Sequence, residues 1–166
     1  MQQKGRQNMK KNTVKRDMTV LNRVKLVIPS LSVNEGFARA AVAAFCAQIN
    51  PCAAELADIK CAVSEAVTNC IVHAYKNTPE GMGNITLTVK LCADRVVIVE
   101  IKDSGCGIPD VKMARTPLFT TDAADERSGM GFTVMESFMD RLRVSSKVGR
   151  GTKVTMYKYL KDQESL

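Results

Sequence analysis

Hydrophobic and polar residues alternate in the middle of the chain, a pattern typical of β-strands with one buried face. In the clearest stretch, four aliphatic residues alternate with polar ones: Ile85, Leu87, Val89 and Leu91. The next stretch, residues 96–102, is more continuously apolar, which favours a position nearer the centre of a sheet. The tight connection at residues 93–94 makes these two strands antiparallel.

Three further strands are predicted from shorter patterns. Residues 24–28 form one that ends at Pro29. Residues 142–148 and 153–159 form two more, joined by a glycine-containing hairpin at residues 149–151.

Two long helices are predicted between the first and second strands. Ser32 and Glu35 have the spacing of a capping box, and the helix that they open carries an apolar stripe that includes Phe37. Asn50 and Pro51 end this helix and start a second one, with Asn50 as its cap. The second helix runs to about Tyr75, and its apolar stripe predicts a buried face.

The second half of the chain contains a long aperiodic stretch. Residues 110–114 predict one helical turn and residues 130–140 an amphipathic helix. Residues 115–129 have no period, which is typical of a functional loop such as a lid, or else of a disordered segment. The order strand-helix-helix-strand-strand-lid-helix-strand-strand predicts an α+β fold. We expect a two-layer α/β sandwich with a mixed, mostly antiparallel sheet and helices on one face.

The net charge of +7 comes from the N-terminal segment. Residues 1–25 hold eight basic residues and one acidic residue, which leaves sixteen of each sign in the rest of the chain. We expect residues 1–22 to be a basic, disordered extension and residues 23–162 to be a single domain. No aromatic residue interleaves with the basic ones, so we expect no direct nucleic-acid binding.

Composition also limits the compartment and the metal chemistry. The longest apolar run, residues 40–47, is too short to span a membrane, and no export signal is recognisable, so we expect a cytoplasmic protein without membrane contact. The six cysteines lack C-x-x-C spacing and His73 is the sole histidine, which excludes a zinc-ligand pattern. We interpret the cysteines as small buried hydrophobic residues, with the exception of Cys106, which lies inside a glycine motif.

Glu65 and Asn69 are the first candidate functional pair. They lie one turn apart on the second helix, on the side away from its apolar stripe. Oxygen ligands of these types suit Mg²⁺, and Glu65 could instead act as a general base. Taken alone, the pair fits the solvated face of an ordinary helix at least as well.

A second group of residues follows the central strand. Asp103 ends this strand and precedes Gly105 and Gly107, which places a carboxylate beside a backbone that a flat ligand can approach closely. Such a carboxylate can accept a hydrogen bond from an exocyclic amine such as that of adenine. The motif alone is weak, because it also describes an ordinary turn after a strand.

A third group surrounds the end of the long loop. Gly129 and Gly131 open a helix, where backbone N–H groups and the helix dipole favour phosphate oxygens. Arg127 lies two residues upstream, within reach of a terminal phosphate. Thr152 follows Gly151 at the start of the last strand.

In this order, the E-x-x-x-N, D-x-G-x-G, lid, G-x-G and G-T motifs resemble the ATP-binding fold of gyrase-type ATPases, Hsp90 chaperones, MutL proteins and histidine kinases. Neither a Walker P-loop nor a Rossmann fingerprint is present. Five separated blocks narrow the resemblance to the sporulation anti-sigma F factors, serine protein kinases of endospore-forming bacteria. These blocks are Phe37-Ala-Arg39, Ser64-Glu-Ala-Val-Thr-Asn69, His73, Pro117-Leu-Phe-Thr-Thr121 and Glu126-Arg-Ser-Gly-Met-Gly-Phe-Thr-Val-Met-Glu136.

The resemblance implies binding of ATP, with ADP as the product, and of Mg²⁺. It assigns Mg²⁺ to Asn69, the base that orients the attacking hydroxyl to Glu65, the γ-phosphate contact to Arg127 and the adenine amino group to Asp103. The remaining nucleotide-binding residues that it implies are Gly105, Gly107, Thr121, Ser128, Gly129, Met130, Gly131 and Thr152. It implies that His73 is structural.

The resemblance also implies a homodimer with two protein partners. One is a sporulation sigma factor, held inactive in the ATP-bound state. The other is an anti-anti-sigma factor, which becomes phosphorylated on a serine. Arg39 would lie on the surface that binds these partners.

Three alternatives stay open at the level of the sequence. The weakest is a nucleic-acid-binding protein, which would rest only on the basic N-terminal segment. The same nucleotide-binding residues would serve an ATP-gated module that sequesters the sigma factor without kinase activity. A histidine-kinase-type ATP-binding domain would need a phosphoacceptor on another protein, because His73 lies inside the E-x-x-x-N helix.

Overall fold

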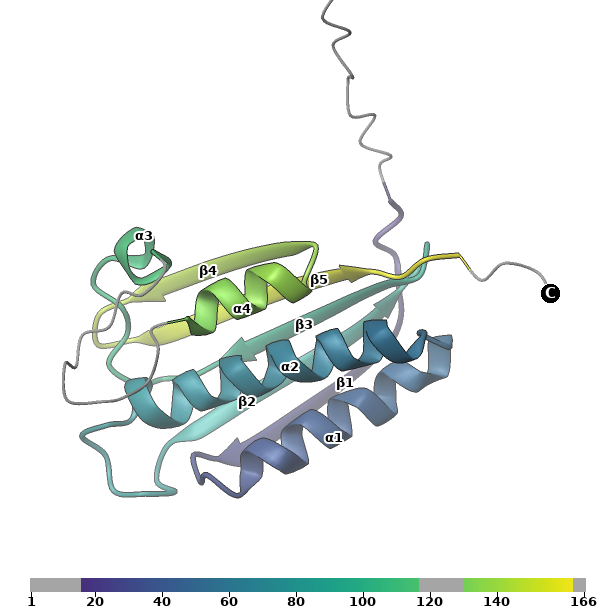
Figure 1. The fold of residues 1–166 in the computed structure, drawn as a ribbon. Coiled ribbons are helices and arrows are strands. Elements are labelled where there is room, and N and C mark those ends of the chain that lie inside the picture. The colour runs from purple at the N-terminus through teal and green to yellow at the C-terminus, as the bar shows by residue number, and fades with distance from the viewer. Residues whose placement is uncertain (1–15, 117–129, 163–166) are drawn as a thin grey trace, which may run out of the picture.

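The structure is a computed structural model of the chain, and it describes residues 16–116 and 130–162. Its centre is one five-stranded sheet in the order β1-β2-β3-β5-β4, with every neighbouring pair antiparallel (Figure 1). The helices cover one face of this sheet, which confirms the predicted two-layer α+β fold, although the sheet is antiparallel throughout and not mixed. The strands are β1 Val20–Pro29, β2 Asn84–Cys92, β3 Val96–Lys102, β4 Arg141–Lys147 and β5 Gly151–Tyr159.

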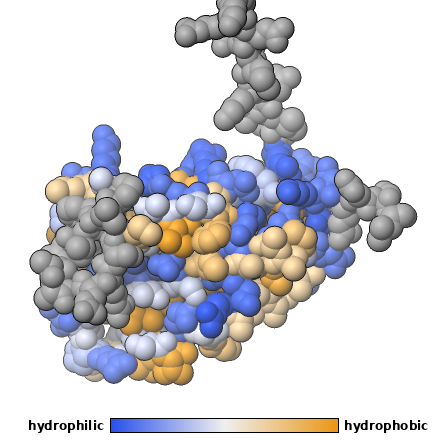
Figure 2. Space-filling model, in the orientation of Figure 1, coloured by the Kyte–Doolittle hydropathy of each residue, from blue (hydrophilic) through white to orange (hydrophobic). Residues whose placement is uncertain are grey.

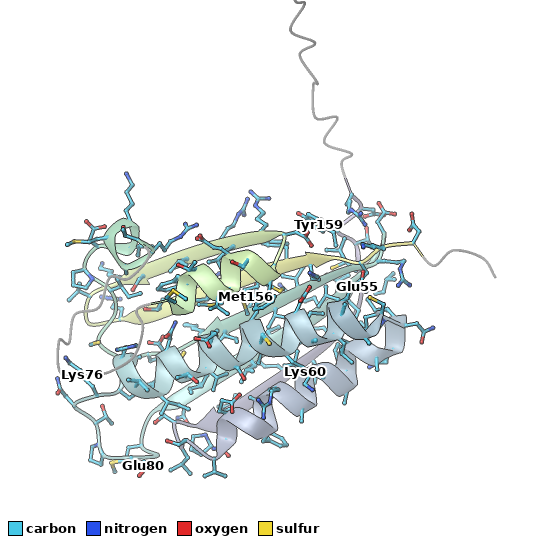
Figure 3. All side chains as sticks on the ribbon, in the orientation of Figure 1. Glu55, Lys60, Lys76, Glu80, Met156 and Tyr159 are labelled. Carbon is cyan, nitrogen blue, oxygen red and sulfur yellow. The ribbon has the colours of Figure 1, made fainter. Side chains whose placement is uncertain are left out.

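The alternating pattern places the core between the sheet and the helices. Ile85, Leu87 and Val89 are fully buried in β2, and Met156 of β5 lies beneath the helices in the same layer (Figure 3). β1 begins at Val20, earlier than the predicted residue 24, and therefore takes in three residues that we had placed in the N-terminal extension.

Three helices form the second layer, and α3 stands apart from it at one end of β4. Helix α2 runs antiparallel to α4, so that the C-terminal end of α2 and the start of α4 lie toward the same end of the domain (Figure 1). The α-helices are α1 Asn34–Cys46, α2 Ala53–Asn69, α3 Val111–Ala114 and α4 Gly131–Phe138. A 3₁₀ turn, Ala47–Ile49, follows α1, and a π-helical turn, Cys70–Ala74, follows α2.

Two details of α1 were predicted wrongly. Val33 is its N-cap and makes no side-chain capping bond; Glu35 instead accepts a hydrogen bond from the Ser64 hydroxyl of α2. The buried face consists of Ala38, Val42 and Cys46, whereas Phe37 is 55% exposed. An i, i+4, i+8 row of small residues lets α1 pack closely on the sheet and α2, and this close packing turns the larger Phe37 outward.

The start of α2 also differs from the prediction. Cys52, not Asn50, is the N-cap, and it forms a capping box with Glu55. Asn50 adopts a left-handed conformation at the end of the preceding 3₁₀ turn, as asparagine often does.

The cysteines are more exposed than we expected. Cys46, Cys70 and Cys92 are buried, but Cys52, Cys61 and Cys106 are exposed, so the assignment of Cys52 and Cys61 to the core was wrong. The reason is local: Cys52 caps a helix and Cys106 lies in a loop. None of the helices in residues 16–116 and 130–162 is long and apolar enough to cross a bilayer.

Glu55 ties the start of α2 to the C-terminal end of β5, at the opposite end of the domain from Lys76 and Glu80 (Figure 3). Its buried carboxylate accepts hydrogen bonds from Cys52 N at 2.8 Å and Lys161 N at 2.7 Å. Burial by itself would raise the pKa of Glu55, but these hydrogen bonds and the charge of Arg95 outweigh it, so the pKa lies below its usual range.

We expect Glu55→Gln to lower the free energy of unfolding by about 1–3 kcal/mol at pH 7, because one backbone N–H loses a charged acceptor. Since the native pKa is lowered, this stabilisation is present above the ordinary pKa of 4.5 and is lost as the pH falls through the native value. Urea unfolding of both proteins from pH 7 to pH 3 should show the difference shrinking on the acid side. The exposed Glu80→Gln is the matched control, and an equal effect of both substitutions would contradict this role of Glu55.

Candidate active site

Glu65 and Asn69 point toward the first residue of α4 rather than into open solvent. A Cβ atom added at Gly131 would lie 3.1 Å from both Oδ1 and Nδ2 of Asn69 and 3.3 Å from Oε2 of Glu65. Both side chains are half-buried on α2, which packs against α4. The absence of a side chain at Gly131 therefore lets the backbone of α4 approach a carboxylate and a carboxamide that lie one helical turn apart.

The start of α4 offers backbone donors at the same place. The first hydrogen bond within the helix runs from Val134 N to Met130 O at 2.8 Å. The N–H groups of residues 131–133 precede it in the first turn of the helix, and N–H groups at this position of a helix are the ones that bind phosphate oxygens. Met130 is the N-cap residue and is 38% exposed.

Asp103 lies at the end of β3 and is only 4% exposed. Its Oδ1 accepts hydrogen bonds from Gly105 N at 2.9 Å and Thr152 N at 3.1 Å. Its Oδ2 lies 3.7 Å from the Cys70 thiol, a long contact that leaves this oxygen with capacity to accept a further hydrogen bond. The carboxylate is thus fixed by backbone groups through one oxygen, while the other faces a weak donor.

Two glycines near Asp103 are required by close packing of the backbone. A Cβ at Gly105 would lie 2.1 Å from Ala74 O, and one at Gly107 would lie 2.3 Å from Lys147 O. Gly107 also has φ +74°, a conformation that favours glycine. These glycines hold the loop after β3 against the end of α2 and against the β4–β5 hairpin, and so shape the surroundings of Asp103.

Thr152 connects Asp103 to the last hairpin. Besides donating its N–H to Asp103, Thr152 accepts at its backbone oxygen the N–H of Asp103 at 3.0 Å. Its hydroxyl lies 2.9 Å from the Ser146 hydroxyl, and Ser146 in turn accepts Ile108 N at 2.7 Å.

The sequence analysis did not identify three residues that form hydrogen bonds in this region: Cys70, Tyr75 and Ser146. The Tyr75 hydroxyl accepts Ser104 N at 2.9 Å and donates to Asn84 O at 2.6 Å. Burial raises the pKa of Tyr75, and burial together with the charge of Asp103 raises that of Cys70, so both remain protonated donors near neutral pH. In the sequence, the positions of Cys70 and Tyr75 at the end of a helix indicate burial but give no sign of their hydrogen-bond partners.

Other predicted residues lie elsewhere or outside the described residues. Thr121, Arg127, Ser128 and Gly129 fall in residues 117–129 and are not described. His73 is exposed, and its backbone oxygen accepts from the Cys106 thiol. Two cavities of about 520 and 640 Å³ lie away from Glu65, Asn69 and Asp103.

Arg39 occupies the exposed side of α1. Its Nη1 lies 3.7 Å from Glu35 Oε1, and Glu35 also accepts the Ser64 hydroxyl. Arg39 is therefore connected through Glu35 to the residue that directly precedes Glu65.

Together, the fold and this arrangement define a histidine kinase-like ATPase domain, and the family model of that description matches residues 29–158. An anti-sigma F factor of Caldanaerobacter subterraneus subsp. tengcongensis is 53% identical over 84% of this chain and 94% of its own length. One from a Geobacillus species is 50% identical over 87% of this chain and 97% of its own. The chain belongs to the anti-sigma F factor family.

A solved structure agrees at the level of the fold. The RsbU and RsbW domains of Rv1364c from Mycobacterium tuberculosis match with a TM-score of 0.62 at 20% identity, over 84% of this chain and 32% of that one. At this identity the likeness supports the arrangement of the sheet and helices and no more.

If Asp103 recognises the adenine amino group, Asp103→Asn should weaken ATP binding about tenfold to a hundredfold, because an amide cannot accept all the hydrogen bonds that the carboxylate accepts. The ratio of ATP affinity to GTP affinity should fall as well, which a purely structural role would not cause. Calorimetric titration with both nucleotides measures this ratio. Asp162→Asn, an exposed change of the same type, should leave it unchanged. An unaltered ratio in Asp103→Asn would exclude the adenine contact.

Proposed function

We propose that this chain is an ATP-dependent anti-sigma factor that inhibits a sporulation sigma factor and phosphorylates a serine of its anti-anti-sigma antagonist. The observation that carries the proposal is the convergence of Glu65 and Asn69 on Gly131 at the start of α4. It combines a carboxylate, an oxygen ligand and phosphate-binding backbone groups in one place. The anti-sigma F names of its relatives support the choice of partner.

The residues on α2 suit phosphoryl transfer to a hydroxyl. Asn69 would hold Mg²⁺, which neutralises phosphate charge when bound and needs few protein ligands. Glu65 would orient the serine hydroxyl and take its proton. The serine oxygen then forms a bond to the γ-phosphorus, the bond from that phosphorus to the β–γ bridging oxygen breaks, and ADP leaves.

The base and the phosphates of ATP would contact different parts of the domain. Asp103 would accept the adenine amino group, within the loop shaped by Gly105 and Gly107 and beside Thr152. For the phosphates, the proposal retains the residues expected from the sequence: Thr121, Arg127, Ser128, Gly129, Met130 and Gly131.

Partner binding would involve α1. Figure 2 shows hydrophobic residues reaching the surface over this helix, where Val33 is 76% and Phe37 is 55% exposed. Exposed apolar residues beside an arginine are typical of protein interfaces. The chain would act as a homodimer, and the sigma factor and the antagonist would compete for Arg39.

The rival interpretation is an ATP-gated module that sequesters the sigma factor without kinase activity. It uses the same adenine and phosphate contacts but assigns no role in proton transfer to Glu65. The two interpretations therefore differ in what the loss of the Glu65 carboxylate does.

We expect Glu65→Gln to lower the rate of phosphoryl transfer at least about a hundredfold and to leave ATP affinity within about threefold, because an amide keeps the shape but cannot accept the proton. The assay uses labelled ATP, Mg²⁺ and an anti-anti-sigma protein from the same organism, with the label traced to a serine. Glu80→Gln is the control. If ATP binds but the unaltered protein transfers no label, the sequestering module is the better interpretation.

Arg39→Ala should weaken binding to both protein partners about tenfold or more while leaving ATP affinity unchanged, because Arg39 lies on the exposed side of α1. Lys60→Ala removes an exposed positive charge from α2 and serves as the control. Surface-immobilised partner proteins give both affinities. Loss of ATP binding in Arg39→Ala, or unchanged binding to both partners, would place the partner surface elsewhere.

A further inference from the structure

The face of the sheet opposite the helices is strongly basic. The strand register places three rows of residues on it, because side chains two apart along a strand point to the same side. The rows are Val27-Thr86-Lys102-Lys153-Ser145, Lys25-Thr88-Glu100-Thr155-Arg143 and Arg23-Lys90-Ile98-Tyr157-Arg141. Seven of these fifteen residues are basic and one is acidic.

This excess is not a property of the chain as a whole. Outside residues 1–25, basic and acidic residues are equal in number, yet five of those basic residues and only one of the acids lie in the three rows. The charges of the domain are therefore unevenly distributed: basic and acidic residues balance overall, but this face of the sheet is positive.

Little within the described residues neutralises these charges. Lys90 pairs with Glu100 at 3.2 Å, the one ion pair on this face among residues 16–116 and 130–162. The guanidinium carbons of Arg141 and Arg143 lie 5.6 and 5.9 Å from the centre of the Tyr157 ring. Stacking on a ring holds a guanidinium along the sheet and leaves its N–H edge able to donate.

The open cavity of about 640 Å³ lies over β3, β5 and β4 on this side. Its lining combines positive charges with hydroxyl groups, from Arg143, Lys153, Ser145, Thr155 and Tyr157, and it also includes the Glu100 carboxylate and Arg115, which pairs with Glu136. Arg143, Lys153 and the hydroxyl groups are hydrogen-bond donors suited to phosphate oxygens.

We propose, contrary to the expectation from the sequence, that this basic sheet face binds nucleic acid through its phosphate backbone, without selecting a base sequence. An apolar protein partner fits less well, since Ile98 is only 8% exposed and the other apolar residue of the three rows, Val27, which is 57% exposed, lies on the edge strand β1 and not at the centre of the face. A second copy placed face to face would oppose two surfaces of the same charge. The proposal rests on the distribution of charge and is independent of the proposed kinase activity.

The test compares two variants of the full chain that remove the same charge. Lys102→Gln, Arg143→Gln and Lys153→Gln together change the sheet face, and Lys10→Gln, Lys11→Gln and Lys15→Gln change the N-terminal segment. Binding of labelled 20-nucleotide single-stranded and duplex DNA is followed by fluorescence anisotropy from about 50 to 200 mM salt, the range in which phosphate contacts weaken strongly. Unchanged melting temperatures confirm that both variants fold.

We expect the sheet-face variant to lose at least about tenfold in affinity at the lowest salt. Its salt slope should fall by about 2 units on single-stranded DNA and by about 3 units on duplex DNA, as three lost phosphate contacts predict. The N-terminal variant should lose less. Equal loss in both, loss in the N-terminal variant alone, or absence of binding by the unaltered chain would overturn the proposal. So would binding of polyglutamate as tight as that of DNA, or a change of oligomeric state in the sheet-face variant.

Discussion

The buried carboxylate of Asp103 is the contact on which the architecture of the candidate site depends. Through one oxygen it receives N–H groups from the loop after β3 and from the start of β5, and through the other it meets the Cys70 thiol at the end of α2. Removing a charged acceptor from such a position leaves buried donors without a partner. A single side chain thus ties together the sheet, the loop and the helix layer at the end of the domain where the site lies.

Around Asp103, neighbouring backbone segments approach each other unusually closely at several points. A Cβ at Gly151, where φ is +87°, would lie 2.3 Å from Asp103 O, and the corresponding distance at Gly105 is 2.1 Å to Ala74 O. The π-helical turn Cys70–Ala74 brings Ala74 O within 2.9 Å of Cys106 N. Turns of this kind are rare and are often found at functional sites, where they redirect a helix end. The glycines therefore allow backbone segments to pack closely against each other, in addition to leaving space for a ligand.

Much of the fold could be predicted from the sequence, because alternation in β2 and periodicity in α2 report burial directly. The buried face of α1 could not be predicted. Its residues Ala38, Val42 and Cys46 give only a weak hydrophobic signal, whereas the strongly hydrophobic Phe37 lies on the exposed side of the helix. Spacing predicted Glu65 and Asn69 as a pair, but only the packing of α4 shows that they face Gly131. Cys70 and Tyr75 were missed as polar contacts because their partners are distant in sequence or lie in the backbone.

Charge is distributed unevenly between the helical side of the domain and the opposite face of the sheet, although the sequence outside residues 1–25 holds equal numbers of basic and acidic residues. Glu65, Asn69 and Arg39 belong to the helical layer, whereas the opposite face of the sheet collects cations from all five strands. A negatively charged nucleotide in the candidate site would lie near the Glu65 carboxylate, which opposes it, so local hydrogen-bond donors would have to hold it. The basic face lies on the other side of the hydrophobic core, and charges on exposed surfaces are screened over about 8–10 Å at moderate salt. A polyanion bound there would have little direct electrostatic effect on nucleotide affinity. Any coupling between the two surfaces would therefore have to pass through the strands themselves. The main candidates are β3 and β5, which are joined by the hydrogen bonds between Asp103 and Thr152.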